Sequence, residues 1–218
     1  MPVAGRPMLD WSLAAFRACE SVHSIVVAAP AGHVGAVVAA QPDVGVVAGG
    51  ATRAESVARA LEAVGTELVA IHDAARPLLT PALVEALLAD LEADDGAAGA
   101  IAAAPVTDTV KRAQPRVAES RGSVFTADAK KEPRDGLAVG ETLNRDELWG
   151  AQTPQLFRRD ALREALAVDA ATRDAATDEA TLVERAGGVV LIHPCEGENL
   201  KVTTPLDLRV AELLLAER

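Results

Sequence analysis

Apolar residues fall into short, nearly continuous runs that are separated by longer amphipathic stretches. The runs are rich in Val, Ile and Ala, and they cover residues 24–29, 44–49, 68–72, 98–106 and 187–194. Continuous apolar runs of this length are typical of strands that are covered on both faces. The pattern therefore predicts a set of buried strands.

The stretches between these runs have the period of helices, and they cover residues 7–19, 53–65, 81–94, 158–168, 177–187 and 204–218. Two of them begin with a Thr-Pro pair, at Thr80-Pro81 and Thr204-Pro205. In such a pair Thr caps the helix and Pro occupies its first position. Strands that alternate with helices predict an α/β fold with a mostly parallel sheet and right-handed crossovers.

Residues 113–141 interrupt this alternation. They are polar, charged and rich in Gly, with one short strand-like piece at 123–127. A long stretch without firm elements is usually functional or disordered. We predict an arm, or partly disordered insertion, at 113–141, and one domain built from residues 1–112 and 142–218.

Composition narrows the classes of partner. Half of the 218 residues are hydrophobic, and 21 basic against 32 acidic residues give a net charge of −11. Nucleic acid or a membrane surface would require a basic face, so neither is expected as a partner. Cys19 and Cys195 lack metal-ligand spacing and indicate free thiols in a reducing compartment. With no secretory pattern and no apolar run of membrane-spanning length, we expect a soluble cytoplasmic protein.

Polar side chains follow several predicted strands, where a parallel sheet binds its ligands. Asp73 and Arg76 follow the strand at 68–72, and Glu198 and Lys201 follow the strand at 187–194. Carboxylates at one edge of a sheet suit a divalent metal, and Arg and Lys beside them suit phosphates. Since phosphoryl chemistry depends mainly on positioning and charge neutralisation, these residues predict a Mg²⁺-assisted, phosphate-handling α/β enzyme.

Three features near the ends of the predicted strands have a second, purely structural interpretation. The turn at Gly49 and Gly50 exposes N–H groups that suit an anion, but an ordinary strand-to-helix turn has the same sequence. Asp73 alternatively caps a turn and pairs with Arg76. His72 lies inside the apolar run, so we interpret it as a packed histidine rather than a general base.

Six motifs make the pattern specific. In chain order they read GGATRAESVARAL, HDAARPLLT, APVTDTVKR, LWGAQTPQLFR, ATDEATLVE and ENLKVTTPLDL. Over nearly the whole chain they resemble the 2-C-methyl-D-erythritol 4-phosphate cytidylyltransferases of the non-mevalonate isoprenoid pathway. The resemblance implies a Rossmann-like, mostly parallel sheet of nucleotidyltransferase type with a protruding β-arm. It also implies transfer of CMP from CTP to 2-C-methyl-D-erythritol 4-phosphate, with Mg²⁺ and with release of pyrophosphate.

On the nucleotide side, the resemblance assigns a cytidine-contacting turn and a metal-binding carboxylate. Gly50, Arg53 and Ser56 match that turn. Asp73 matches the residue that binds the nucleotide and its metal ion, and it is also a candidate contact to the substrate. Glu198, at the same predicted edge, is the second candidate metal ligand.

On the acceptor side, Arg76 matches a contact to the sugar phosphate, and Lys201 and Arg159 match the catalytic residues that hold the acceptor for attack. Thr142 matches a substrate contact on the arm, which in the family reaches across a homodimer. The resemblance therefore implies a homodimer in which Arg159 and Thr142 serve the partner's site.

The sequence differs from the family at three places. Ala51 replaces a frequent Asp, and the arm at 113–141 is longer than expected. The chain opens at VAGRPMLDW, which resembles the segment after the family's first strand, glycine-rich loop and Pro-Lys pair. We expect translation to begin upstream of Met1, since without that strand two sheet edges are unpaired and the triphosphate lacks its cradle. The alternative is a short form with little or no activity.

Two further functions remain open at this point. A pentitol-phosphate cytidylyltransferase, acting on ribitol 5-phosphate, would share the HDAAR segment. A catalytically inactive paralogue that binds nucleotide would account for the absent glycine-rich loop. Retention of Asp73, Arg76, Arg159 and Lys201 together favours the active enzyme, because a nucleotide-binding relic does not need groups that position an acceptor.

Overall fold

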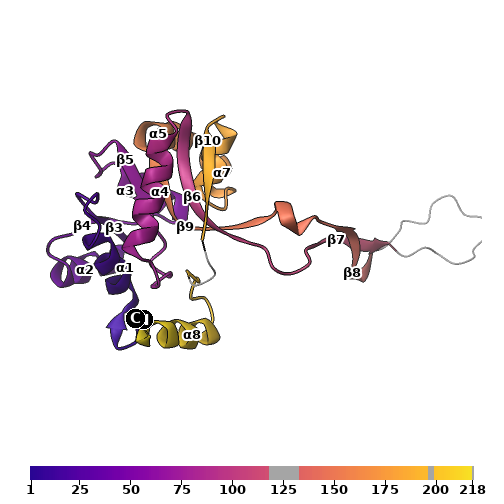
Figure 1. Cartoon of the computed structure of the whole chain (residues 1–218), viewed down its shortest axis with the longest axis horizontal. Coiled ribbons are helices and arrows are strands. Elements are labelled where there is room, and N and C mark those ends of the chain that lie inside the picture. Colours follow the sequence, from indigo (N-terminus) through magenta and orange to yellow (C-terminus); the bar gives the residue numbers. More distant parts are fainter. Residues whose placement is uncertain (118–132, 196–198, 218) are drawn as a thin grey trace, which may run out of the picture. The chain divides into compact units, whose positions relative to one another are not determined.

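The computed structural model describes residues 1–117, 133–195 and 199–217 (Figure 1). They form two compact units, one of Met1–Ala104 with Ala151–Arg218 and one of Pro105–Gly150. Of the helices in the described ranges, none combines the length and apolar character that crossing a membrane requires.

The first unit contains two main sheets and a short N-terminal β-hairpin. The larger sheet has the strand order β10-β6-β9-β5, and the smaller pairs β3 with β4. Strands β6 and β10 run parallel, as do β3 and β4, whereas β9 runs antiparallel to β5. The strands are β3 (Val26–Ala29), β4 (Gly45–Ala48), β5 (Leu68–Ile71), β6 (Ala97–Pro105), β9 (Trp149–Arg158) and β10 (Val189–Pro194). A short hairpin of β1 (Pro2–Val3) and β2 (Arg6–Pro7) precedes them.

The helices of the first unit connect these strands. They are α1 (Met8–Arg17), η1 (Ala31–His33), α2 (Val34–Ala40), α3 (Arg53–Leu61), α4 (Pro81–Ala93), α5 (Arg159–Leu166), α6 (Ala170–Asp174), α7 (Glu179–Arg185) and α8 (Pro205–Ala216). The mostly parallel α/β fold is thus confirmed, and each predicted strand and helix of the first unit forms within or close to its expected range. Strands β1, β2 and β9 and the helices η1, α2 and α6 were not predicted.

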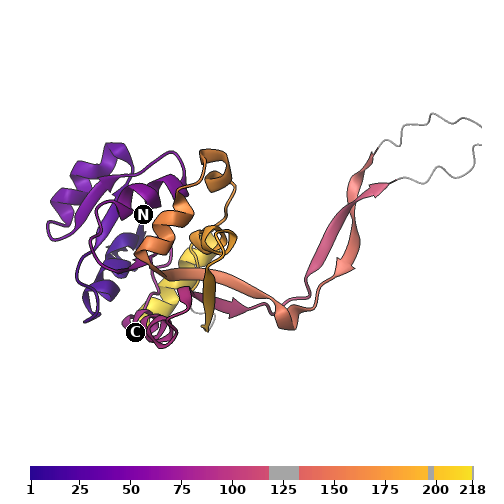
Figure 2. The ribbon, with the colours of Figure 1, turned by 90° about the horizontal axis from the view of Figure 1, so that it is seen from above.

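Helices cover both faces of the larger sheet. Ile101 of β6 and Phe157 of β9 belong to a core cluster with residues of α3, α5 and α7. Ala100 of β6 and Leu156 of β9 belong to a second cluster with residues of α4. Because neighbouring residues of a strand point to opposite faces, the two clusters lie on opposite sides of the sheet. Figure 2 shows α4 and α5 on these two sides.

The second unit is built around an antiparallel pair of β7 (Lys111–Val117) and β8 (Pro133–Thr142), in which Lys111 lies opposite Thr142. A short 3₁₀ helix, η2 (Arg145–Glu147), follows β8. The predicted arm at 113–141 lies within this unit. Its strand-like piece at 123–127 lies outside the described residues.

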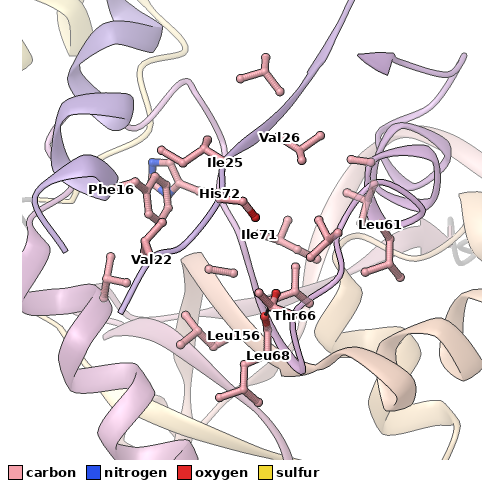
Figure 3. Close-up of a pocket in the computed structure, with 18 of the residues that line it drawn as sticks. Phe16, Val22, Ile25, Val26, Leu61, Thr66, Leu68, Ile71, His72 and Leu156 are labelled. Atoms are coloured by element: carbon pink, nitrogen blue, oxygen red, sulfur yellow. Dashed lines mark hydrogen bonds between the residues drawn. The ribbon is translucent and has the colours of Figure 1, made fainter. Parts of the chain in front are cut away.

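A cavity separates the two sheets of the first unit (Figure 3). It has a volume of about 720 Å³ and is lined mainly by apolar side chains. Consecutive residues of β3, Val26 to Ala28, and of β5, Leu68 to Ile71, border it. Since odd and even positions point to opposite faces, a wall made of consecutive residues is the edge of a strand. The cavity therefore lies between the edges of β3 and β5.

The last helix begins with the predicted cap at Thr204. Thr204 Oγ1 accepts from the Asp207 N–H at 3.2 Å, and Asp207 Oδ2 accepts from the Thr204 N–H at 2.7 Å. Asp207 also accepts from the backbone and the hydroxyl of Thr203, and chiefly for this reason its pKa is lowered to about 2. The start of α8 thus depends on an ionised Asp207.

Replacing Asp207 with Asn is expected to lower the thermal unfolding midpoint in a pH-dependent way. A depressed carboxyl pKa stabilises the fold above the unfolded pKa, near 3.9, and this contribution is lost as pH falls through the folded value of about 2. Unfolding midpoints of wild type and Asp207→Asn, measured by circular dichroism, should differ most above pH ~4 and converge towards pH ~2. A difference that is constant over this range would contradict the assignment.

Candidate active site

A row of alternating charges lies beyond the carboxyl end of β5. Lys201 Nζ donates to Asp73 Oδ2 at 2.7 Å, and Arg53 Nε donates to Asp73 Oδ1 at 3.0 Å. The same Arg53 donates through Nη1 to Glu179 Oε2 at 2.5 Å. We refer to Lys201, Asp73, Arg53 and Glu179 as the charge row.

Local sequence explains how these four side chains meet. Asp73 follows β5, and Lys201 follows β10. Arg53 and Glu179 are the first residues of α3 and α7, whose N-caps accept hydrogen bonds from the backbone of the first turn. In α/β folds of this kind the carboxyl ends of parallel strands and the N-termini of the following helices share one edge, so the sequence brings both acids and both bases there.

The charge row runs from solvent into the interior. The Lys201 side chain is 44% exposed and that of Glu179 is 1% exposed. Burial alone raises the pKa of Asp73, but the hydrogen bond from Lys201 and the charge of Arg53 outweigh it and lower that pKa. Burial raises the pKa of Glu179, and the adjacent Arg53 opposes this rise. Asp73 is therefore ionised at neutral pH and lies between two cations.

Arg76 lies beside the charge row but does not pair with Asp73 through its side chain. Its backbone N–H donates to the Asp73 carbonyl at 2.9 Å, so the expected turn forms. The guanidinium instead donates from Nη1 to the Asn199 carbonyl at 2.6 Å, and Asn199 Nδ2 donates to the Thr153 carbonyl at 2.8 Å. Within the described residues, the buried Arg76 Nε has no hydrogen-bond partner. The alternative of an Asp73–Arg76 side-chain pair is therefore wrong.

His72 is a packed histidine, as interpreted from the sequence. Its ring lies edge-on to Phe16, with centroids 5.6 Å apart, and Figure 3 shows the two rings beside the cavity. Burial lowers the pKa of His72 to about 4, so the ring is neutral. The Thr153 hydroxyl lies 3.1 Å from His72 Nδ1 and accepts from the Asp73 N–H at 3.0 Å. His72 and Thr153 thus fix the backbone that carries Asp73.

The turn before α3 is closed by its own side chains. Gly50 N–H donates to Ser56 Oγ at 3.0 Å, and Ala51 N–H donates to Glu55 Oε2 at 2.7 Å. A Cβ on Gly50 would lie 2.3 Å from Glu55 Cγ, so this position requires glycine. An anion at this turn would have to replace Ser56 and Glu55 as acceptors of these N–H groups.

Comparison with known proteins identifies the family. A family model for 2-C-methyl-D-erythritol 4-phosphate cytidylyltransferase (IspD) matches residues 1–217. The chain belongs to this family. It is 41% identical over 237 residues to an enzyme of that name from Cupriavidus pinatubonensis, covering 98% of this chain and 84% of the relative.

Other members of the family agree with this assignment. A crystal structure of the cytidylyltransferase from Thermus thermophilus superposes with a TM-score of 0.75 at 33% identity, covering 99% of this chain and 92% of that one. A bifunctional IspD/IspF enzyme from Anaeromyxobacter sp. is 42% identical over 223 residues, which are 99% of this chain. The chain spans about half, 52%, of that relative's length.

Arg159, an expected catalytic residue of this IspD family member, lies away from the charge row. Its N–H donates to the Glu67 carbonyl at 2.8 Å and its Nη1 donates to the Val64 carbonyl at 3.2 Å. Arg158, just before it, pairs with Leu68 at the start of β5, whereas Asp73 follows the end of that strand. Within the first unit, Arg159 and Asp73 are therefore at opposite ends of β5.

Two other expected site residues lie outside the described part of the first unit. Thr142 belongs to the second unit, where its hydroxyl accepts from Lys111 Nζ at 2.7 Å. Glu198 lies outside the described residues. The cytidine-turn residues Gly50 and Ser56 are joined to each other at the start of α3, and Arg53 on the same helix joins them to Asp73.

Sequence reasoning missed three residues of the site. Glu179 completes the charge row, Thr153 supports the Asp73 backbone, and Asn199 holds Arg76. All three lie within the motifs on which the resemblance rests, so the motifs could have indicated them. Their residue types alone could not have indicated a site, because Thr, Asn and a first-turn Glu are common on exposed surfaces.

In the described part of the site, Asp73 is the accessible carboxylate for a metal ion, and it is not part of a larger cluster of ligands. Among them, no group of three or more His, Cys, Asp or Glu side chains is placed to hold a metal. Mg²⁺ is commonly bound by one or two carboxylates together with substrate phosphates. Asp73 is ionised and its side chain is 17% exposed, so it would hold a Mg²⁺ that arrives with a nucleotide once Lys201 or Arg53 releases one of its oxygens.

Proposed function

We propose that this chain transfers CMP from CTP to the phosphate of 2-C-methyl-D-erythritol 4-phosphate. Membership of the IspD family supports this reaction. The observation in the chain itself that carries the proposal is the charge row, which puts two cations and a carboxylate at the ligand-binding edge of the sheet. We further propose that the protein acts on these small molecules in the cytoplasm, as a homodimer with Mg²⁺.

The reaction requires positioning more than acid-base chemistry. An oxygen of the acceptor phosphate attacks the α-phosphorus of CTP, and the bond from that phosphorus to the bridging oxygen of the β-phosphate breaks. Pyrophosphate leaves with the electron pair of that bond, and CMP remains on the acceptor. Bound Mg²⁺ would supply neutralisation of the phosphate charge.

The proposed roles divide along the charge row. Arg53, with Gly50 and Ser56 of the α3 turn, holds the nucleotide. Asp73 holds the metal and keeps Arg53 and Lys201 in place until substrates bind. Arg76 and Lys201 then hold the acceptor phosphate, since each presents a cation beside Asp73.

Two of the remaining expected residues are proposed to come from the second subunit. Arg159 of the partner subunit and Thr142 of the partner subunit would contact the acceptor. This division is consistent with Arg159 lying at the opposite end of β5 from Asp73. Glu198 is proposed as an additional ligand of the metal.

Release of pyrophosphate from CTP, Mg²⁺ and 2-C-methyl-D-erythritol 4-phosphate tests the proposal. The Lys201→Ala variant is expected to lower kcat by about a hundredfold, since it removes a cation that stabilises transition-state charge. Arg163→Ala, which alters an exposed pair with Asp160, serves as the control. A folded wild-type chain that is silent, or that prefers ribitol 5-phosphate as acceptor, would overturn the proposed reaction.

Mixing two inactive variants tests the shared site. If Arg159 acts in the partner's site, a heterodimer of Lys201→Ala and Arg159→Ala contains one intact site. Random exchange of subunits should then restore about a quarter of wild-type activity. No recovery, despite heterodimers observed by native mass spectrometry, would place Arg159 outside the partner's site.

A further inference from the structure

Glu179 is a buried acid that the proposed reaction does not use directly. Its side chain is 1% exposed, and its neighbours Leu182 and Val183 belong to the buried core. Oε2 accepts from Arg53, while within the described residues Oε1 has no hydrogen-bond partner. A buried carboxylate is costly unless it is paired, so Arg53 is what makes an ionised Glu179 tolerable here.

Arg53 has two acidic partners of different accessibility. Its Nε faces Asp73, whose side chain is partly exposed, and its Nη1 faces Glu179. Asp73 in turn has two cationic partners, Arg53 and Lys201. A ligand that engages Asp73 must compete with these cations, whereas nothing from solvent competes for Glu179.

We propose that Glu179 is a positioning residue for Arg53. Glu179 accepts from Nη1 of Arg53 on the interior side and so keeps the guanidinium in the site. When a cation that is bound to the nucleotide takes Asp73 as its ligand, the Nε side of the guanidinium becomes available to the nucleotide. Glu179 contacts no substrate in this scheme and acts through Arg53. The inference rests on the proposed function only for the identity of the nucleotide.

A double-mutant cycle separates this role from a purely structural one. Glu179→Gln keeps the shape of the side chain but removes its charge. With CTP and Mg²⁺ in calorimetry, it is expected to weaken CTP affinity on the order of tenfold, and in kinetics to raise KM for CTP more than it lowers kcat. In an Arg53→Met background the same substitution is expected to change CTP affinity less than about twofold, because the residue through which it acts is absent.

Controls distinguish charge from packing. Glu179→Asp keeps the charge on a shorter side chain and should recover part of the lost affinity. Asp90→Asn, the same change of acid to amide at the Asp90–His193 pair, should leave CTP affinity unchanged. Equal losses from Glu179→Gln in both backgrounds, or a lower unfolding midpoint with unchanged CTP affinity, would overturn the proposal.

Stability measurements test the pairing without any nucleotide. Arg53→Met alone leaves Glu179 buried and unpaired, so its thermal midpoint should lie below that of Arg53→Met/Glu179→Gln. If wild type fails to bind CTP while this order of midpoints holds, the proposed function fails and the anchoring of Arg53 by Glu179 is supported. The reverse order of midpoints would contradict the anchoring.

Discussion

Replacing Asp73 with Asn is expected to lower kcat for pyrophosphate release by about a thousandfold, which corresponds to about 4 kcal/mol of transition-state stabilisation. The amide cannot hold a divalent cation as the carboxylate does, and it leaves Lys201 without the partner that fixes its ammonium group 2.7 Å away. Two electrostatic contributions are thus removed by one substitution.

The fold should survive this change. The Asp73 N–H still donates to Thr153, Arg53 retains Glu179, and Lys201 can turn to water. Asp43→Asn, which breaks an exposed pair with Arg17, is the matched control and should leave kcat unchanged. If Asp73→Asn keeps more than about a tenth of wild-type kcat, Asp73 does not have the central role proposed.

Replacing Phe157 with Ala is expected to reduce the free energy of unfolding by about 3–5 kcal/mol. The ring is 0% exposed and belongs to the cluster that joins β9 to α3, α5 and α7. It also lies directly over Gly99 of β6, where a Cβ would come within 2.4 Å of Phe157 Cδ1. Since aromatic residues make up only 2% of the chain, few other large side chains can move into the space left behind.

Urea unfolding of matched variants measures this contribution. Phe157→Leu should cost less than Phe157→Ala, because it leaves a smaller cavity. Leu206→Ala removes a side chain that is 68% exposed on α8, and should change the free energy of unfolding by less than about 0.5 kcal/mol. A loss below about 1.5 kcal/mol for Phe157→Ala would mean that the surrounding helices collapse onto the cavity.

Elements with a single local signal were predictable from the sequence. Continuous Val and Ala runs indicated β3 to β6 and β10, and the Thr-Pro caps marked the starts of α4 and α8. Strand β9 was missed because its buried positions include polar residues, Thr153 and Gln155. Their partners, such as the Asp73 N–H and the Asp178 carboxylate, lie far away in the sequence, so no local pattern shows that these positions are buried.

Those site residues that lie just after the end of a strand could be predicted from the sequence. Asp73 and Lys201 follow strands, and Arg53 opens a helix after one, so the topology of the sheet brings them together. Arg159 follows β9, which runs antiparallel to β5, and it therefore emerges at the other edge. Glu179 resembles an exposed first-turn acid, because its burial is decided by how α7 packs and not by its neighbours in sequence.

Because the first unit is divided into two main sheets, Arg53 also connects segments that belong to different sheets. The described residues pair β3 only with β4, and β5 only with β9, so no backbone ladder connects the two sheets. Arg53 follows β4, yet it binds Asp73 after β5 and Glu179 on α7. This side chain adds a polar link between the α3 turn and the sheet that carries the acid, beside the packing of α3 against β6 and β9. A ligand that inserts between Arg53 and Asp73 is therefore expected to weaken that link while the packing of α3 remains.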